Sequence, residues 1–170
     1  MSRKIRSTVL CGLFAGLIVL CGWISLPIPP IAVTLQTFGV LLTLGLLGGK
    51  LGMYAVGTYL LMGLVGLPVF AGFRGGAAAL LDPTGGFLWG FLLGALGYRM
   101  AEKLGKLPAM LLCQLICYLC GCIWFARWSG NPSLWASALV CVVPCLIPDA
   151  LKLALALILS RRIGKQLKYQ

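Results

Sequence analysis

Apolar residues dominate this chain in long runs, and polar residues gather in short stretches between those runs. Such runs are typical of membrane-spanning helices, since about 20 apolar residues cross the hydrocarbon core of a bilayer. The pattern predicts an all-α integral membrane protein with six spans in a single domain, 1–170. The expected spans are approximately 7–26, 34–47, 51–67, 84–100, 108–128 and 134–159.

Prolines and glycines mark the expected ends of these spans. Three prolines (Pro27, Pro29 and Pro30) end the first run, and a Gly-Gly-Lys turn at 48–50 separates the second run from the third. The sequence Ser-Gly-Asn-Pro at 129–132 is expected to form a further turn before the last run. The helices are therefore expected to be joined by short connections.

The composition agrees with a membrane protein. Hydrophobic residues make up 61% of the chain, charged residues 10%, and the mean hydropathy is +1.03, whereas soluble domains carry about 25% charged residues. Six spans in 170 residues leave no room for a soluble catalytic domain.

The chain has a net charge of +11, and the positions of its basic residues indicate how it is oriented in the membrane. Basic residues lie before the first span, at Lys50, between the fourth and fifth spans, and after the last span. With six spans, all of these positions lie on one side, so the positive-inside rule predicts cytoplasmic termini. A nucleic-acid partner is not expected, since it would require a solvated basic face with aromatic residues.

The segment 66–90 is the least membrane-like part of the centre of the chain. It is rich in glycine and contains Arg74 and Asp82, and the predicted topology places it outside the cell. We therefore expect 68–83 to be an extracellular lid loop over a ligand. Two roles remain open for Arg74: it pairs with Asp82 to hold the loop, or it contacts a ligand carboxylate.

Two charges lie inside the last predicted span. Asp149 and Lys152 are three residues apart, so they share a helix face. A charge near the bilayer centre costs about 2.5–3.5 kcal/mol and usually faces a cavity or a partner. One interpretation is an ion pair that merely makes its own burial tolerable, and the favoured one is a ligand site. Thr34 and Gln36 either begin the second helix or line the same cavity.

Eight cysteines lie inside apolar runs, and there is no histidine. Cys113, Cys117 and Cys120 share one helix face, which could indicate a metal or iron–sulfur site. Zinc sites, however, use cysteine pairs on turns, so these residues are better explained as small residues in helix packing. Without histidine there is no Ser-His-Asp set, and the chain contains no Walker A motif. We expect no metal, no cofactor and no enzymatic activity.

Four strings resemble the BioY family in order and spacing: VTLQT (33–37), GLPVFAG (66–72), PTGGF (83–87) and PDALK (148–152). BioY proteins are biotin-binding S components of energy-coupling factor transporters. The resemblance covers essentially the whole chain. It implies an S-component-like bundle in the bacterial inner membrane that captures biotin from outside for uptake.

The resemblance also implies partners and contacts. The partners are a transmembrane T component and two ATPases, with Gly12, Ala15 and Gly16 of the first span facing the T component. Asp149 suits the ureido N–H groups, and Lys152 suits the ureido oxygen or the carboxylate. The implied ligand-binding residues are Asp149, Lys152, Gln36, Thr34, Phe70, Phe73, Arg74, Thr84 and Gly85.

Other functions are compatible with the same sequence. An S component for another vitamin, such as riboflavin or thiamine, belongs to the same broad class. A small membrane enzyme or an assembly subunit belongs to a different class, and for a lipid-modifying enzyme we find no titratable nucleophile. A chain acting alone in the lipid bilayer, a homo-oligomer and a complex with ATPases all agree with the sequence.

Overall fold

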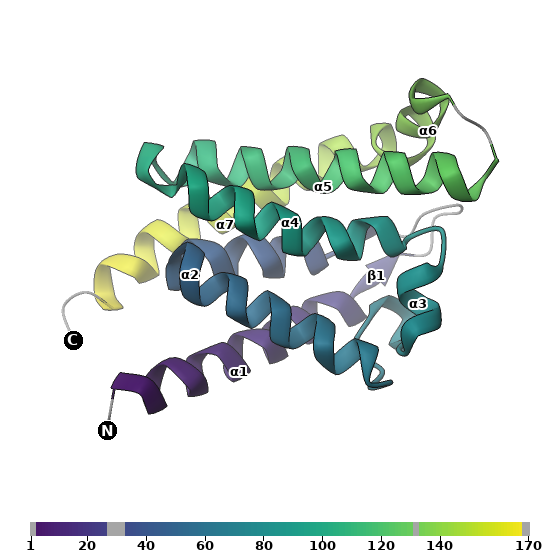
Figure 1. Cartoon of the computed structure of the whole chain (residues 1–170). Coiled ribbons are helices and arrows are strands. Elements are labelled where there is room, and N and C mark those ends of the chain that lie inside the picture. Colours follow the sequence, from purple (N-terminus) through teal and green to yellow (C-terminus); the bar gives the residue numbers. More distant parts are fainter. Residues whose placement is uncertain (1–2, 27–32, 131–132, 168–170) are drawn as a thin grey trace.

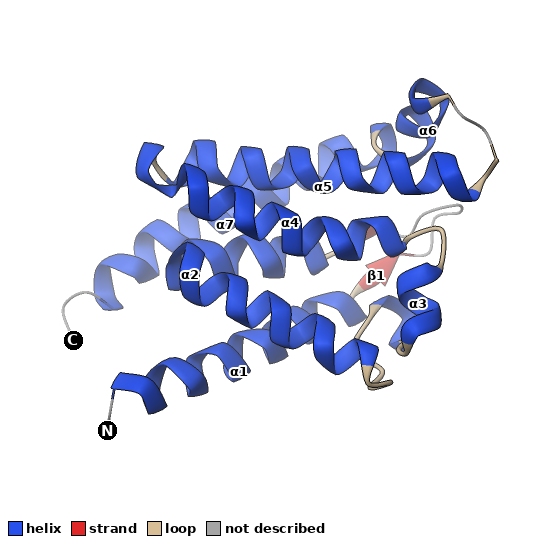
Figure 2. Ribbon diagram, viewed as in Figure 1, coloured by secondary structure: helices blue, strands red, loops and turns tan. Residues whose placement is uncertain are grey.

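The computed structural model describes residues 3–26, 33–130 and 133–167, and almost all of them are helical (Figures 1 and 2). The elements in chain order are α1 (Arg3–Trp23), β1 (Ser25–Leu26), β2 (Val33–Thr34), α2 (Gln36–Leu64), η1 (Ala71–Phe73), α3 (Ala77–Leu81), α4 (Gly85–Ala101), η2 (Glu102–Leu104), α5 (Lys106–Trp128), α6 (Leu134–Cys141) and α7 (Val143–Leu167). The long helices form one bundle. α1 begins and α7 ends at the end of the bundle opposite β1 and α3 (Figure 1).

The element α2 is a helical hairpin. Gly48 has φ 77° and ψ 170°, a conformation that glycine adopts without steric cost, and the helix axis reverses there. A Cβ atom on Gly52 would lie 3.0 Å from the Cα of Leu44, although residues eight apart in a straight helix are separated by about 12 Å. Glu102 holds the turn, since its carboxylate accepts a 2.7 Å hydrogen bond from the backbone N–H of Gly49. The expected turn at 48–50 is therefore present.

The first helix ends earlier than the predicted 7–26. α1 stops at Trp23, and Ser25 and Leu26 pair in antiparallel fashion with Thr34 and Val33. A residue before proline disfavours helical geometry, which explains the extended backbone at Leu26. The expected connection through Pro27, Pro29 and Pro30 lies outside the described residues.

The predicted loop 68–83 is not irregular throughout. It contains the short helices η1 and α3, and Phe70 and Arg74 form an isolated antiparallel bridge. Its glycines allow close backbone approach: a Cβ on Gly75 would collide with the backbone of Leu67. The loop is thus a folded cap over one end of the bundle.

The last predicted span, 134–159, is divided into α6 and α7, which corrects the expectation of one continuous helix. The break falls at Val142, just before Pro144. Proline has no N–H to donate and its ring clashes with the carbonyl four residues earlier, so a helix cannot continue normally through Pro144. Pro144 instead lies in the first turn of α7, where proline is tolerated.

The outer surfaces of the helices are apolar, as expected for contact with lipid. Exposed side chains include Leu13, Leu61, Leu119 and Leu151. Four helices of the described chain are long and apolar enough to cross a membrane: Lys4–Trp23, Gln36–Leu64, Lys106–Trp128 and Val143–Gly164. Since α2 folds back on itself and α4 has only 17 residues, helix length does not fix the number of crossings, and six spans stay a prediction.

Glycines on α4 allow it to pack closely against α5. Cβ atoms on Gly90 and Gly94 would lie 2.9 Å from the Cα of Cys117 and 2.8 Å from the carbonyl oxygen of Cys113, respectively. Cysteines therefore serve as small packing residues at this interface, as the sequence indicated. Close backbone approach through small residues is a common source of helix association in membranes.

Replacing Gly86 with Ala tests this packing. The new Cβ would lie 2.8 Å from the carbonyl oxygen of Cys120 and collide with Trp124, so α4 and α5 must separate. We expect a loss of about 1–3 kcal/mol in stability, measured as a lower unfolding temperature in detergent. Gly57→Ala is the matched control, since nothing lies within 4 Å of its Cβ position. Equal unfolding temperatures for the two variants would contradict the packing argument.

Candidate ligand-binding site

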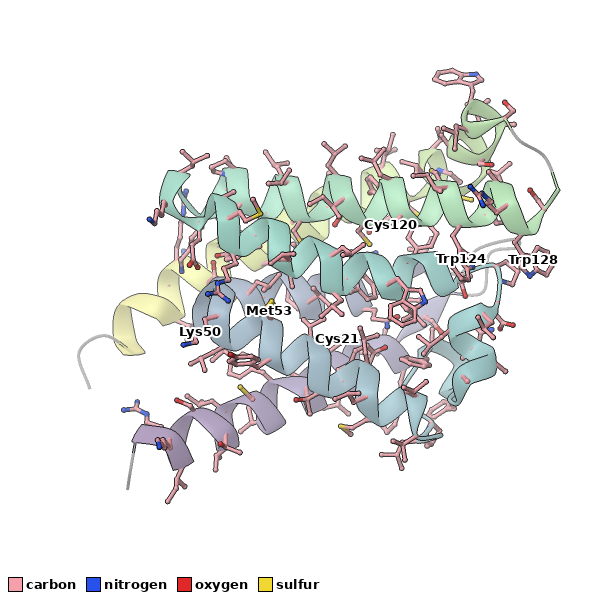
Figure 3. The ribbon with its side chains drawn as sticks, viewed as in Figure 1. Cys21, Lys50, Met53, Cys120, Trp124 and Trp128 are labelled. Carbon is pink, nitrogen blue, oxygen red and sulfur yellow. The ribbon has the colours of Figure 1, made fainter. Side chains whose placement is uncertain are left out.

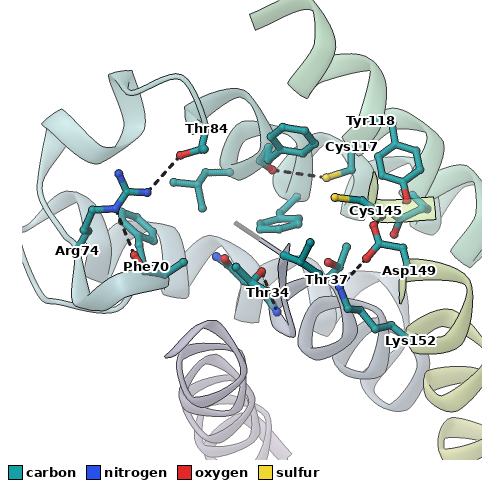
Figure 4. Close-up of a pocket in the computed structure, with 17 residues that line it drawn as sticks. Thr34, Thr37, Phe70, Arg74, Thr84, Cys117, Tyr118, Cys145, Asp149 and Lys152 are labelled. Carbon is teal, nitrogen blue, oxygen red and sulfur yellow. Dashed lines mark hydrogen bonds and ion pairs between the residues drawn. The ribbon is translucent and has the colours of Figure 1, made fainter. Parts of the chain in front are cut away.

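One cavity lies beneath the folded loop, between α2, α4, α5 and α7 (Figure 4). Seven of the nine residues predicted to bind ligand line it: Thr34, Gln36, Phe70, Arg74, Thr84, Asp149 and Lys152. These residues come from β2, α2, the 68–83 loop, the turn before α4, and α7. Segments far apart in the sequence thus contribute to one site.

Phe73 and Gly85, the other two predicted residues, do not line the cavity. Phe73 is 62% exposed and lies against Trp23 with ring centroids 5.0 Å apart. Gly85 packs on the backbone of Leu80, where a Cβ atom would collide with the carbonyl oxygen. In this structure both residues shape the loop rather than the cavity wall.

A buried polar cluster forms one end of the cavity. Asp149 and Lys152 are each 6% exposed, and the Lys152 Nζ lies 2.7 Å from Asp149 Oδ1. The other carboxylate oxygen, Oδ2, accepts hydrogen bonds from the Tyr118 hydroxyl at 2.7 Å and from Gln114 Nε2 at 3.1 Å. The opposite charges of the pair cancel, so the cluster is buried without a net charge.

Helix α7 carries both Asp149 and Lys152 and determines where they lie. Their spacing of three residues places both on the face that meets α5 and the cavity. Pro148 inside α7 has no N–H, so the carbonyl four residues earlier lacks its usual helical partner. Lys152 has three N–H donors, and one of them points to Asp149. The cluster can therefore offer both hydrogen-bond donors and acceptors to a polar ligand.

Arg74, a residue of the 68–83 loop, forms the other polar end of the cavity. Its guanidinium lies 2.5 Å from Asp82 Oδ2 and donates to the Thr84 hydroxyl at 3.3 Å and to the carbonyl of Ala71 at 3.2 Å. Figure 4 shows Arg74 and Thr84 on one side of the cavity and Asp149 and Lys152 on the other. Arg74 thus pairs with Asp82 and also lines the cavity.

Aromatic residues supply much of the remaining wall. Phe70 is 2% exposed and meets Tyr59 edge to face, with ring centroids 5.5 Å apart. Phe87 and Phe91 of α4 also line the cavity. Gln36, which also lines the cavity, donates a hydrogen bond from its Nε2 to the Tyr59 hydroxyl. The cavity therefore combines two polar ends with apolar walls.

Thr34 has both of the roles that the sequence left open, since it lies at the start of the second helix and also lines the cavity. Its hydroxyl accepts a 3.3 Å hydrogen bond from the backbone N–H of Gln36 at the start of α2, and its side chain lines the cavity together with Thr37. The same residues begin the helix and form the wall.

Gln114 and Tyr118, which both contact Asp149, were not predicted from the sequence. A signal was available, since both are polar residues within the apolar run 108–128 and are separated by four positions, one helical turn. Cys117 and Cys145, which line the cavity beside Asp149 (Figure 4), were also not predicted as site residues.

The face predicted for a partner helix on α1 is only partly open. Nothing lies within 4 Å of a Cβ position on Gly12 or Gly16, but Ala15 is fully buried in the core. Residues four apart share a helix face, whereas residue 15 lies about 100° away from residue 16 around the axis. Ala15 is therefore not part of an exposed contact surface.

Helices with apolar outer surfaces around a cavity that is polar at both ends and apolar along its walls are typical of a small-molecule-binding protein of the membrane. Comparison with known proteins gives the particular family. Residues 1–169 match the BioY family, and the chain belongs to it.

Individual relatives agree with this assignment. The chain is 37% identical to a probable biotin transporter BioY of Pyrococcus horikoshii, over 75% of this chain and 78% of that protein. It is 53% identical to the biotin transporter BioY of Thermotoga maritima, although the alignment spans only about half of each, 53%. A crystal structure of the S-component for biotin from an ECF-type ABC transporter superposes with a TM-score of 0.87 at 28% identity, covering 97% of this chain and 95% of that one.

Proposed function

We propose that this protein takes up biotin as the substrate-capturing S component of an energy-coupling factor transporter. The observation that carries the proposal is the cavity, in which a buried Asp149–Lys152 pair lies across from the guanidinium of Arg74. The family membership and the structural likeness to a biotin S-component support it. Its role is transport rather than catalysis.

Biotin matches the cavity group by group. Its ureido ring has two N–H donors and one carbonyl acceptor, which suit Asp149 and Lys152. Its thiophane ring and hydrocarbon chain suit the aromatic wall formed by Phe70, Phe87 and Phe91. Its carboxylate, at the far end of the chain, suits Arg74. Thr34, Gln36 and Thr84 complete the polar wall.

Capture takes place from outside a bacterial inner membrane. Lys50 lies at the end of the bundle where α1 begins, and Trp124 and Trp128 lie at the opposite end, near the folded loop (Figure 3). Basic residues favour the cytoplasmic side and tryptophans favour the interfaces. With six spans, both termini are cytoplasmic and the 68–83 loop covers the cavity from outside.

The proposed transporter includes partner proteins. This chain has no Walker A motif, so a transmembrane T component and two ATPases provide the energy. Gly12 and Gly16, with open space at their Cβ positions, form the α1 surface that a partner helix approaches closely.

Titration with labelled biotin tests the function. Purified protein in detergent is expected to bind biotin without ATP, because the cavity lies within this chain alone. Unlabelled biotin should displace the label, and riboflavin and thiamine in excess should not. No binding of labelled biotin, together with binding of labelled riboflavin or labelled thiamine, would contradict the proposal and favour another S component.

A further inference from the structure

Gln114 has one amide atom whose hydrogen bonding is incomplete. The side chain is 7% exposed, lines the cavity and donates from Nε2 to Asp149 Oδ2 at 3.1 Å. Its other amide atom, Oε1, is fully buried and has no hydrogen-bond partner among the described residues. Buried polar atoms in native proteins are nearly always paired, so this oxygen calls for a donor.

The chemistry of Asp149 fixes which amide atom is the oxygen. Asp149 is paired with Lys152 at 2.7 Å and accepts from Tyr118, so it is a carboxylate, and a carboxylate only accepts. The amide atom that faces it must therefore be the nitrogen, since an oxygen there would place two acceptors together. Gln114 Oε1 is consequently an unpaired acceptor on a side chain that lines the cavity.

The lone pairs of Asp149 show why a second acceptor is useful. Each carboxylate oxygen offers about two lone-pair sites. Oδ2 already accepts from Gln114 and Tyr118, and Oδ1 accepts from Lys152. About one site therefore remains on Asp149, but a cyclic urea presents two N–H donors.

We propose that Gln114 is a specificity-determining residue whose Oε1 accepts a hydrogen bond from one ureido N–H of the ligand, while Asp149 accepts the other. The inference rests on the proposed function, since it assumes biotin in this cavity. It makes the site selective for a ring with two N–H groups. A ring that has lost the donor facing Gln114 leaves Oε1 buried and unpaired, which is costly.

Two biotin analogues test the inference, each a cyclic carbamate in which a ring oxygen replaces one N–H. The unaltered protein should bind both at least ~10-fold more weakly than biotin. In Gln114→Met, one of the two isomers should bind within about twofold of biotin, because no acceptor remains to be left unpaired. The variant should still bind the other isomer more weakly than biotin, because that isomer lacks the N–H donor that faces Asp149.

Tyr118→Phe is the matched control. It removes another hydrogen bond to the same Asp149 oxygen but leaves Gln114 Oε1 in place, so it should keep the discrimination against both isomers. If Gln114→Met also discriminates fully against both isomers, or if the unaltered protein binds both as tightly as biotin, the inference is overturned. The binding of the two isomers by the unaltered protein therefore tests the inference even if the variant does not fold. Absence of biotin binding by the unaltered protein would instead overturn the proposed function, and the inference with it.

Discussion

Lys152→Met should abolish biotin binding and lower stability by about 3–5 kcal/mol, the cost typical of breaking a buried ion pair. The substitution leaves the Asp149 carboxylate in a buried site without its cation, which lies 2.7 Å away in this structure. The hydrogen bonds from Gln114 and Tyr118 remain, but both donors are neutral and do not balance the charge of the carboxylate. The unfolding temperature and biotin titration in detergent measure the two effects separately.

The double variant Asp149→Asn with Lys152→Met separates stability from binding. It removes both charges, and replacing a buried pair with neutral residues is often close to neutral for stability. We expect its unfolding temperature to return towards that of the unaltered protein, with biotin affinity still reduced at least ~100-fold. Recovery of biotin binding together with stability would show that the pair only compensates its own burial and that the ligand binds elsewhere.

The contact between Asp149 and Lys152 could be predicted from sequence because it lies within one helix. Its partners on α5 could not be placed, since that requires knowing which face of α5 meets α7. Soluble helices reveal this through an apolar stripe, but a helix such as α5 is apolar on all sides, with Leu115 and Leu119 exposed and Met110 buried. Hydrophobicity alone therefore cannot orient it, and Gln114 and Tyr118 were missed.

Local sequence signals predicted the turns better than they predicted whether an apolar run forms one unbroken helix. The Gly-Gly-Lys turn was correct because Gly48 needs a backbone conformation that most residues avoid. The last span was drawn as one helix because its apolar run is continuous, although Pro144 already indicated the break between α6 and α7. The short helix α3 was not anticipated, because its five residues leave too little pattern to detect.

Arg74→Gln should weaken biotin binding about 10-fold, because a guanidinium forms strong charge-assisted hydrogen bonds with a carboxylate. The affinity for biotinamide, whose chain ends in an uncharged amide, should change little. Arg74 lines the cavity, and its side chain is 47% exposed, so the contact is partly screened by solvent and a larger effect is not expected.

Asp82→Asn is the control that distinguishes ligand contact from loop support. Both substitutions remove the 2.5 Å ion pair between Arg74 and Asp82, but only Arg74→Gln removes the cation. If Arg74 binds the ligand carboxylate, Asp82→Asn should keep or increase biotin affinity, because the guanidinium is released from a competing anion. If the pair acts only to hold the loop, both variants should weaken biotin and biotinamide equally. Comparing two ligands with two variants thus assigns the role of Arg74, since loop support cannot depend on the charge at the far end of the ligand.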